Sequence, residues 1–199
     1  MIGSQTPRTF ALNSLATASG RLVHLGAMAR EDIGIRDIAA SLSKLCRFSG
    51  ATRTFYSVAQ HSVLVADMLY DDPVAACYGL LHDAHEAYVG DITRPLRVLI
   101  ETMAGEDLVS HICNDAQRAI HSSLGLAWPV PISIAAKVRH ADDVALATEF
   151  RDLMESDPPV GLPTAWPRAI TRTLSWDKAE DQFMDRFNAL LPAARAAAA

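Results

Sequence analysis

The residues best suited to chemistry stand close together near the middle of the chain. Two histidines and three carboxylates fall within ten residues, directly after an apolar run: His82, Asp83, His85, Glu86 and Asp91. Carboxylates that share a buried site repel one another and lose solvation, so they need a cation or a shared proton nearby. Imidazole and carboxylate together suit a divalent metal ion. The stretch therefore predicts the centre of a metal-dependent hydrolase.

Side chains on two other predicted helices could complete this centre. His61 lies on the inward, apolar face of one helix, and Asp142 and Asp143 lie on a long helix further along the chain. Consecutive helices of a bundle can bring such positions around one ion. Two imidazoles and two carboxylates would leave two positions of an octahedral ion for water and substrate.

The spacing of apolar residues predicts the helices that must position these groups. The predicted helices cover 37–46, 57–70, 74 to about 87, 107–124, 132 to about 154 and 176–191. Residues 1–32 are expected to form an arm or small hairpin, residues 33–191 a helical bundle, and residues 192–199 a frayed, alanine-rich tail. Because loops rather than strands separate the helices, the expected class is all-α.

Side chains around the predicted donors could handle protons or hold a substrate. Glu86 follows Asp83 by three residues and so shares a surface of the predicted helix with it. It could take a proton from the attacking water, or serve as a structural carboxylate. Asp91 could reach back over the site from the following loop. Arg47 and Phe48 end an earlier helix and could grip a phosphate and pack on a sugar or base, or form an ordinary loop.

Composition narrows the class of partner. The 199 residues suit one domain, and with half of them hydrophobic and 21% charged they can bury a sizeable core. The net charge of −5 argues against broad electrostatic binding to a nucleic-acid polymer or an anionic membrane. A nucleotide substrate remains possible, because a bound metal ion and a few arginines can make the site locally positive despite the negative net charge of the chain.

The cysteines and the apolar runs predict a cytoplasmic protein. Cys46, Cys77 and Cys113 are widely spaced and form no C-x-x-C pair, which favours a reducing compartment in which they act as small core residues. The chain opens with no basic segment followed by an apolar one, and no run of 18 apolar residues occurs.

The order of the predicted donors resembles that of a known superfamily. His61, the pair His82-Asp83 and Asp142 follow the pattern H…HD…D of the HD-domain metal-dependent phosphohydrolases. The longer motif over 82–91, HDAxE followed by GD, is similar to the bacterial 5′-deoxynucleotidases of this superfamily. That branch also includes small phage dATP triphosphohydrolases. The likeness covers the chain from about residue 20 to about residue 190 and implies an HD-domain helical bundle.

The resemblance implies a complete set of metal ligands. His61, His82, Asp83 and Asp142 would hold a divalent ion, with Asp142 preferred to Asp143 because the family places this aspartate directly after an alanine. A ligand set of histidine and aspartate accepts Mn²⁺, Co²⁺, Fe²⁺, Zn²⁺ or Mg²⁺, so the identity of the ion stays open.

The resemblance also assigns roles to five further residues. Glu86 would carry the acid/base role, and Asp91 would contact the substrate or position the attacking water. Arg47 would bind phosphate, Phe48 would pack on the deoxyribose, and Arg97 could touch a phosphate chain.

Some positions depart from the family pattern. Phe48 replaces a tryptophan and so lacks an indole N–H donor, and Arg97 stands where relatives often carry lysine. His85 occupies a position that is usually small in relatives, and we expect an exposed neighbour of the site rather than a ligand of a second ion. His121, further along the chain, is also expected at the surface.

The predicted activity is the release of phosphate from 5′-deoxynucleoside monophosphates. The same site could act instead on a deoxynucleoside triphosphate, for which Arg53, Arg94 and Arg97 are candidate contacts to the β- and γ-phosphates. A third alternative is an inactive HD module that binds a nucleotide or a partner protein. The apolar helices and the family likeness favour a homodimer or higher homo-oligomer.

Overall fold

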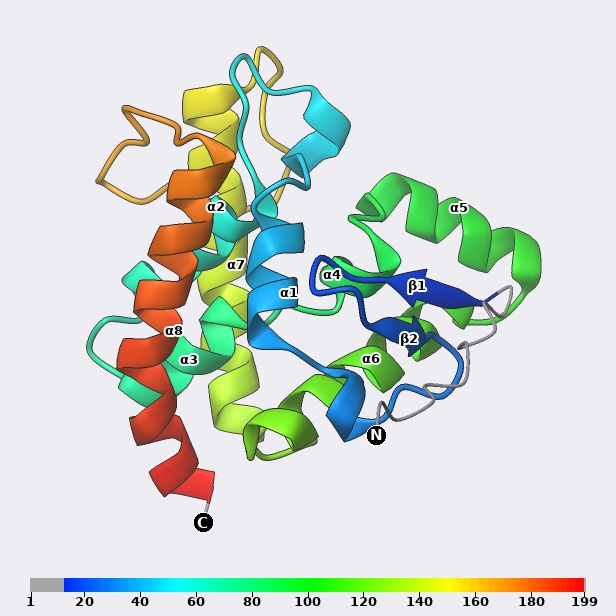
Figure 1. The fold of residues 1–199 in the computed structure, drawn as a ribbon. Coiled ribbons are helices and arrows are strands. Elements are labelled where there is room, and N and C mark those ends of the chain that lie inside the picture. The colour runs from blue at the N-terminus through cyan, green and yellow to red at the C-terminus, as the bar shows by residue number, and fades with distance from the viewer. Residues whose placement is uncertain (1–12, 199) are drawn as a thin grey trace, which may run out of the picture.

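The computed structural model describes residues 13–198, and it is built almost entirely of helices (Figure 1). Its elements, in chain order, are β1 Ser14–Ala16, β2 Leu22–His24, the 3₁₀ helix η1 Arg30–Asp32, α1 Ile35–Leu42, the 3₁₀ segment η2 Arg47–Gly50, α2 Val58–Met68, α3 Pro73–Leu80, α4 Glu86–Val89, α5 Arg94–Ala104, α6 Leu108–Leu124, α7 Ile132–Leu153 and α8 Trp176–Ala198. The predicted all-α class with a short N-terminal hairpin is confirmed.

The hairpin is antiparallel and small. Leu15 pairs with Val23, whose side chain is fully buried. Asp37 in α1 ties the hairpin turn to the bundle, because its carboxylate accepts hydrogen bonds of 2.7 Å from both the backbone N–H and the hydroxyl of Ser19. The first twelve residues of the predicted arm lie outside the described residues.

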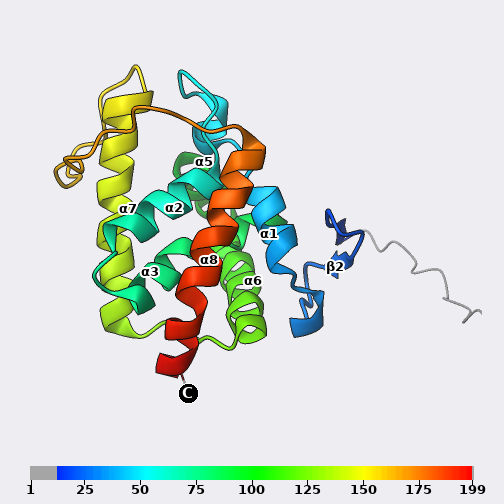
Figure 2. The same cartoon turned by 60° about the vertical axis from the view of Figure 1, so that its left-hand side comes forward.

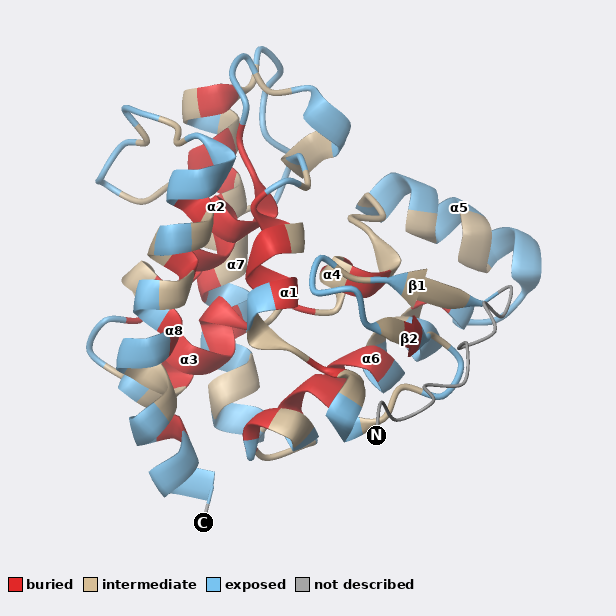
Figure 3. Ribbon diagram, viewed as in Figure 1, coloured by how far each residue is buried: buried red, intermediate tan, exposed pale blue. Residues whose placement is uncertain are grey.

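The bundle is organised around α2 and α3. Figure 2 shows these two helices between α7 and α8, and Figure 3 shows that they carry much of the buried surface. All residues of α3 from Ala75 to Leu80 are buried, as expected for a helix that is apolar all round. A side chain at Gly79 would place its Cβ 3.0 Å from Leu69 and 3.2 Å from Val65. Glycine therefore permits the close approach of α2 and α3.

The prediction of one helix from 74 to about 87 is wrong. α3 ends at Leu80, turns follow, and α4 begins only at Glu86. The His82 Nδ1 lies 2.7 Å from the carbonyl oxygen of Gly79, the acceptor that the backbone N–H of Asp83 would use in a continued helix. The side chain thus competes with the backbone for this carbonyl and places the His-Asp pair in a turn.

The predicted frayed tail is helical as far as the structure describes it. α8 continues through Pro192 to Ala198. Ala194 is buried, and the Arg195 Nε donates a 2.7 Å hydrogen bond to the carbonyl oxygen of Leu124 at the end of α6. Packing against α6 therefore holds this segment. Among the helices of residues 13–198, none combines the length and the apolar character that crossing a membrane requires.

Candidate metal centre

Two histidines and an aspartate meet where α2 lies beside the turn after α3. His61 is fully buried, and its Nε2 lies 3.2 Å from the Nε2 of His82. The Oδ2 of Asp83 lies 3.1 Å from the His82 Nε2 and 3.6 Å from the His61 Nε2. Each residue offers one ligand atom, and these atoms lie within 4.8 Å of one another. The three residues form a group that could hold a metal ion.

Asp142 approaches the two imidazoles from α7. Its Oδ1 lies 3.1 Å from the Nε2 of His61 and 3.7 Å from the Nε2 of His82. The compact three-residue group does not include Asp142, whose side chain is 40% exposed. Asp142 nevertheless brings a second carboxylate to the same pair of nitrogens, as the sequence pattern expected of one of the two aspartates.

The carboxylates of this centre strongly favour their charged forms. Burial opposes the ionisation of Asp83, but the charge and hydrogen bond of His82 outweigh it and lower the pKa of Asp83. Burial likewise opposes ionisation of Asp142, and hydrogen bonds from His61 and His82 lower its pKa. Protons on the imidazoles thus balance the negative charge, a role that a bound cation could equally fill.

Glu149, which was not among the predicted site residues, holds His61 in place. This fully buried carboxylate lies 2.7 Å from the Nδ1 of His61 and accepts a 2.9 Å bond from the Nη2 of Arg47. When the Nδ1 of His61 donates to Glu149, its Nε2 faces the centre and can bind an ion in place of a proton. Glu149 stands seven residues after Asp142, two helical turns along one face of α7, and this spacing was the available signal.

His82 is oriented by the backbone instead. Its Nδ1 donates to the carbonyl oxygen of Gly79 at 2.7 Å, which leaves its Nε2 directed at His61. Both imidazoles therefore present the nitrogen that a metal ion would need, each fixed by a hydrogen bond through the other nitrogen.

Arg47 and Phe48, the predicted substrate contacts, lie beside the centre. The Nη1 of Arg47 is 3.9 Å from Asp83, and although burial opposes its charge, Glu149 and Asp83 raise its pKa. Phe48 adopts a left-handed backbone, with φ 53° and ψ 32°. Its ring packs edge-on against Phe150 with centroids 5.4 Å apart, and the Arg47 guanidinium lies 5.1 Å from its centroid. A non-glycine residue in this conformation marks local strain of the kind found at functional sites.

A cavity of about 570 Å³ opens onto the centre. Its volume suits a small-molecule ligand. Its lining includes the predicted catalytic and substrate-binding residues together with one carboxylate of the three-residue group: Arg47, Phe48, Asp83, Glu86, Asp91 and Arg97. The fold therefore brings these residues of η2, α4, α5 and the segments on either side of α4 to one cavity.

Glu86 is the most strongly perturbed acid of this cavity. It is buried, and burial followed by the charge of Asp83 raises its pKa to about 10. Its Oε2 has no hydrogen-bond partner among residues 13–198. Because α3 ends before it, Glu86 starts a new helix, and the expected helix surface shared with Asp83 does not form. Burial also raises the pKa of Asp91.

The three arginines predicted to contact the β- and γ-phosphates lie at two different places in the structure. Arg94 and Arg97 belong to α5 and line the cavity. Arg53 instead donates to the carbonyl oxygens of Asp152 and Met154, at 2.8 and 3.1 Å, at the C-terminal end of α7. The prediction of Arg53 as a contact has no support in this position, because its guanidinium already serves as a cap for that helix.

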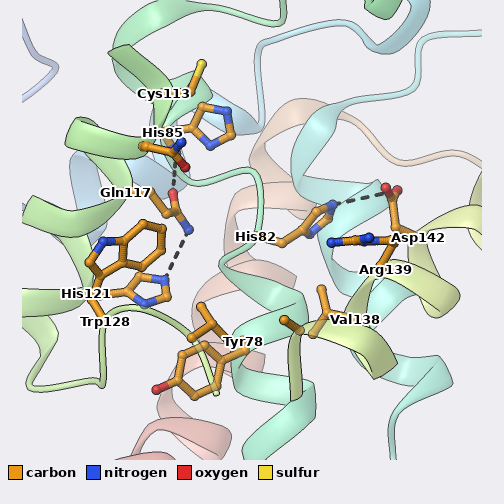
Figure 4. Close-up of a pocket in the computed structure, with 13 residues that line it drawn as sticks. Tyr78, His82, His85, Cys113, Gln117, His121, Trp128, Val138, Arg139 and Asp142 are labelled. Atoms are coloured by element: carbon orange, nitrogen blue, oxygen red, sulfur yellow. Dashed lines mark hydrogen bonds and ion pairs between the residues drawn. The ribbon is translucent and has the colours of Figure 1, made fainter. Parts of the chain in front are cut away.

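Two histidines expected at the surface lie inward. His121 is 1% exposed, and His85 is half-buried, with an Nδ1 that is shielded from solvent and has no hydrogen-bond partner in the described part of the chain. The backbone N–H of His85 donates to Gln117 at 3.2 Å. Both histidines line a second cavity, together with His82 and Asp142 (Figure 4).

The fold and the site together define an all-α protein with a candidate His-His-Asp metal centre. No family model matches the chain. The uncharacterized protein YfdR of Escherichia coli is 35% identical over 189 residues, which cover 90% of this chain and 96% of that protein. An uncharacterized protein of Rhodobacter capsulatus is 32% identical over 142 residues, 68% of this chain and 70% of its own length. The chain belongs to the same protein family as YfdR.

Proposed function

We propose that this protein is an HD-domain phosphohydrolase that releases phosphate from 5′-deoxynucleoside monophosphates and depends on a divalent metal ion. The observation that carries the proposal is the convergence of His61, His82 and Asp83, with the two Nε2 atoms 3.2 Å apart and Asp142 in contact with both. These four residues come from three separate parts of the chain in the order H…HD…D.

The residues present fit a divalent ion. Two imidazole Nε2 atoms, which an ion would bind in place of their protons, and two carboxylates form a donor set that divalent ions accept, and Glu149 and Gly79 orient the two imidazoles from behind. His61, His82, Asp83 and Asp142 would hold the ion. When bound, the ion would acidify a water molecule and neutralise charge on a phosphoryl group.

Glu86 would carry the proton. Burial, followed by the charge of Asp83, raises the pKa of its carboxyl to about 10, so Glu86 holds a proton at neutral pH when no ion is bound. Compensating the charge of Asp83 removes the second cause and lets Glu86 exchange a proton with the attacking water. Asp91, in the same cavity, would position that water or contact the substrate.

Arg47 would bind the phosphate. Its guanidinium stays charged between Glu149 and Asp83, and it borders the cavity next to the metal donors. A fixed positive charge there would stabilise the charge that grows on the non-bridging oxygens. Phe48, at the same wall, would pack on the deoxyribose.

Hydrolysis of a deoxynucleoside triphosphate is the second candidate. Arg94 and Arg97 line the same cavity, whose volume of about 570 Å³ leaves room beyond one phosphate. The bond broken at the α-phosphate and the residues around it would be the same in both reactions. The two activities differ in whether these outer arginines contact the substrate.

A substrate screen with metal add-back tests the proposal. The chelated protein receives each divalent ion in turn, with a panel of deoxynucleoside mono- and triphosphates, and the released orthophosphate or triphosphate is measured. Asp83→Ala should abolish metal binding and turnover together, whereas Asp157→Ala, in the exposed loop after α7, should retain both. Nucleotide binding without turnover under every metal would identify an inactive module instead.

A further inference from the structure

The second cavity, of about 320 Å³, shares a wall with the candidate metal centre but takes no part in the proposed hydrolysis. His82 and Asp142 border it on one side. Figure 4 shows the rings of Tyr78, His121 and Trp128 lying across the cavity from His82. A space of this size beside a candidate centre, with its own set of walls, can hold a separate small molecule.

Three aromatic rings form a rigid wall. The Tyr78 and His121 centroids are 5.2 Å apart and those of His121 and Trp128 are 5.1 Å apart, both edge-to-face. Gln117 Nε2 lies 3.1 Å from His121 Nε2, and the His121 Nδ1 donates to Ala127. The Tyr78 hydroxyl accepts a 3.0 Å bond from the Ala127 N–H. Because these bonds fix Tyr78 and His121 before any ligand arrives, and Trp128 packs edge-on against His121, the wall suits a flat ring packed against it.

The cavity also has polar groups at its edge. The Nδ1 of His85 is shielded from solvent and has no hydrogen-bond partner among the residues that the structure describes. Leaving such an atom unpaired costs free energy, and His85 as a whole is half-buried and lines the cavity, so a turn of its imidazole that brings Nδ1 to a polar group of a ligand is favoured. Asn114 and Arg139 stand at the exposed rim and can meet further polar groups of a ligand.

We propose that this cavity binds the uncharged heteroaromatic base of a nucleoside, with the ring against Tyr78, His121 and Trp128 and its polar edge toward His85. Its inner wall is aromatic and aliphatic, while Asp142 and Arg139 stand near its other side. An uncharged base matches these walls, and the attached sugar can lie toward the polar side. This site is separate from the cavity that contains Arg47 and does not require a bound metal ion.

Binding to the chelated full-length protein tests this site without any turnover. We would titrate 2′-deoxyadenosine and thymidine by calorimetry and follow tryptophan fluorescence, because the ring of Trp128 lines the cavity. At least one of the two nucleosides should bind saturably and change the fluorescence, whereas deoxyribose and inorganic phosphate should not. Absence of saturable binding by both nucleosides overturns the site, whatever the phosphate-release assay shows.

A matched pair of variants on α7 locates the binding. Ala135→Phe puts a ring into the cavity and should weaken nucleoside binding by about tenfold or more, because the space is then filled. Ser133→Phe adds the same ring at an exposed position of the helix and should change binding by less than about twofold. Equal binding by the two variants contradicts the proposal.

A rim variant covers the case in which Ala135→Phe disturbs folding. Asn114 is exposed, so Asn114→Leu keeps the fold and removes one polar group from the rim. It should weaken nucleoside binding by about threefold or more while the circular dichroism spectrum stays that of the natural protein. If Ala135→Phe does not fold, unchanged binding by Asn114→Leu overturns the site on its own.

Discussion

At the scale of residues, the centre depends on buried groups that would touch no substrate. Glu149 has no exposed surface, yet it fixes the tautomer of His61 and anchors Arg47 at the same time. A carboxylate behind a histidine ligand typically sharpens its orientation and raises its basicity. The metal affinity of His61 should therefore depend on Glu149 as well as on the donors themselves.

Glu149→Gln should lower the affinity for a divalent ion by about tenfold to a hundredfold. The amide is nearly isosteric but carries no charge for the imidazole and the guanidinium that contact Glu149. Calorimetric titration with Co²⁺ or Mn²⁺ measures the effect. Glu155→Gln, an exposed glutamate beyond α7, is the control and should bind the ion normally. Equal affinity in the two variants would mean that His61 is oriented without Glu149.

The second residue-scale prediction concerns pH and Glu86. The pKa of Glu86 is raised to about 10 in the folded protein and is about 4.5 when unfolded, so between these values the folded state binds more protons. Its contribution to stability therefore falls as pH rises from about 4.5. Glu86→Gln removes this loss, and in chelator it should raise the free energy of unfolding at pH 8 by about 2 kcal/mol or more.

The same comparison at pH 5 supplies the control for Glu86. At pH 5, only about half a unit above the unfolded pKa, little of this loss has accumulated, so the variant and the natural protein should differ by less than about 1 kcal/mol. Urea unfolding of the chelated proteins at the two pH values measures the difference. A gain at pH 8 no larger than the gain at pH 5 would show that Glu86 does not hold its proton in the folded state.

At the scale of elements, the position of the His-Asp pair depends on where α3 ends and how closely it packs. The His82 imidazole donates a hydrogen bond to the Gly79 carbonyl oxygen, which would accept the next backbone bond if the helix continued. The chain therefore turns before α4. Gly79 lies in α3, just before this turn. Because it has no side chain, α3 can approach Val65 in α2 and Leu69 at the end of α2. Gly79 thus helps to set the distance between α2, which carries His61, and the turn that carries His82.

Gly79→Val should destabilise the protein by about 2 kcal/mol. Its Cβ would already lie 3.0 Å from Leu69 and 3.2 Å from Val65, and two further methyl groups have to be placed between tightly packed helices. Denaturant unfolding measures the change. Gly26→Val is the matched control, because a Cβ there meets its nearest neighbour at 3.6 Å. Similar losses for both variants would show that α2 and α3 can separate at little cost.

At the scale of the whole molecule, the candidate centre joins segments that are distant along the chain. His61 comes from α2, the His82-Asp83 pair from the turn after α3, and Asp142 from α7. An ion held by all of them binds the folded state and not the unfolded chain. Metal binding should therefore raise the free energy of unfolding of the entire bundle.

Divalent ion added to the chelated protein at about 100 times its dissociation constant should raise the free energy of unfolding by about 2.7 kcal/mol. Thermal unfolding with and without chelator measures this gain. His61→Ala should lose it, and His111→Ala, on the exposed face of α6, should keep it. A gain that survives in His61→Ala would place the ion outside this centre.

Periodicity and residue type predicted the helical class and the inward position of His61, and the order of the motif singled out the donors. They could not locate the end of α3, because a side-chain hydrogen bond from His82 decides it and helix propensity does not include that bond. The inward positions of Glu149 and His121 were missed for a related reason: a polar residue on a long helix shows its burial only once its partners are known.

The sequence by itself determined which residue types are available, their helical spacing and the order H…HD…D, because these follow from local pattern alone. Only the tertiary structure decided that the two Nε2 atoms face each other, that Asp142 lies close to both, and that Glu149 stands behind His61. Those distances arise from packing among helices far apart along the chain, and no local pattern encodes them.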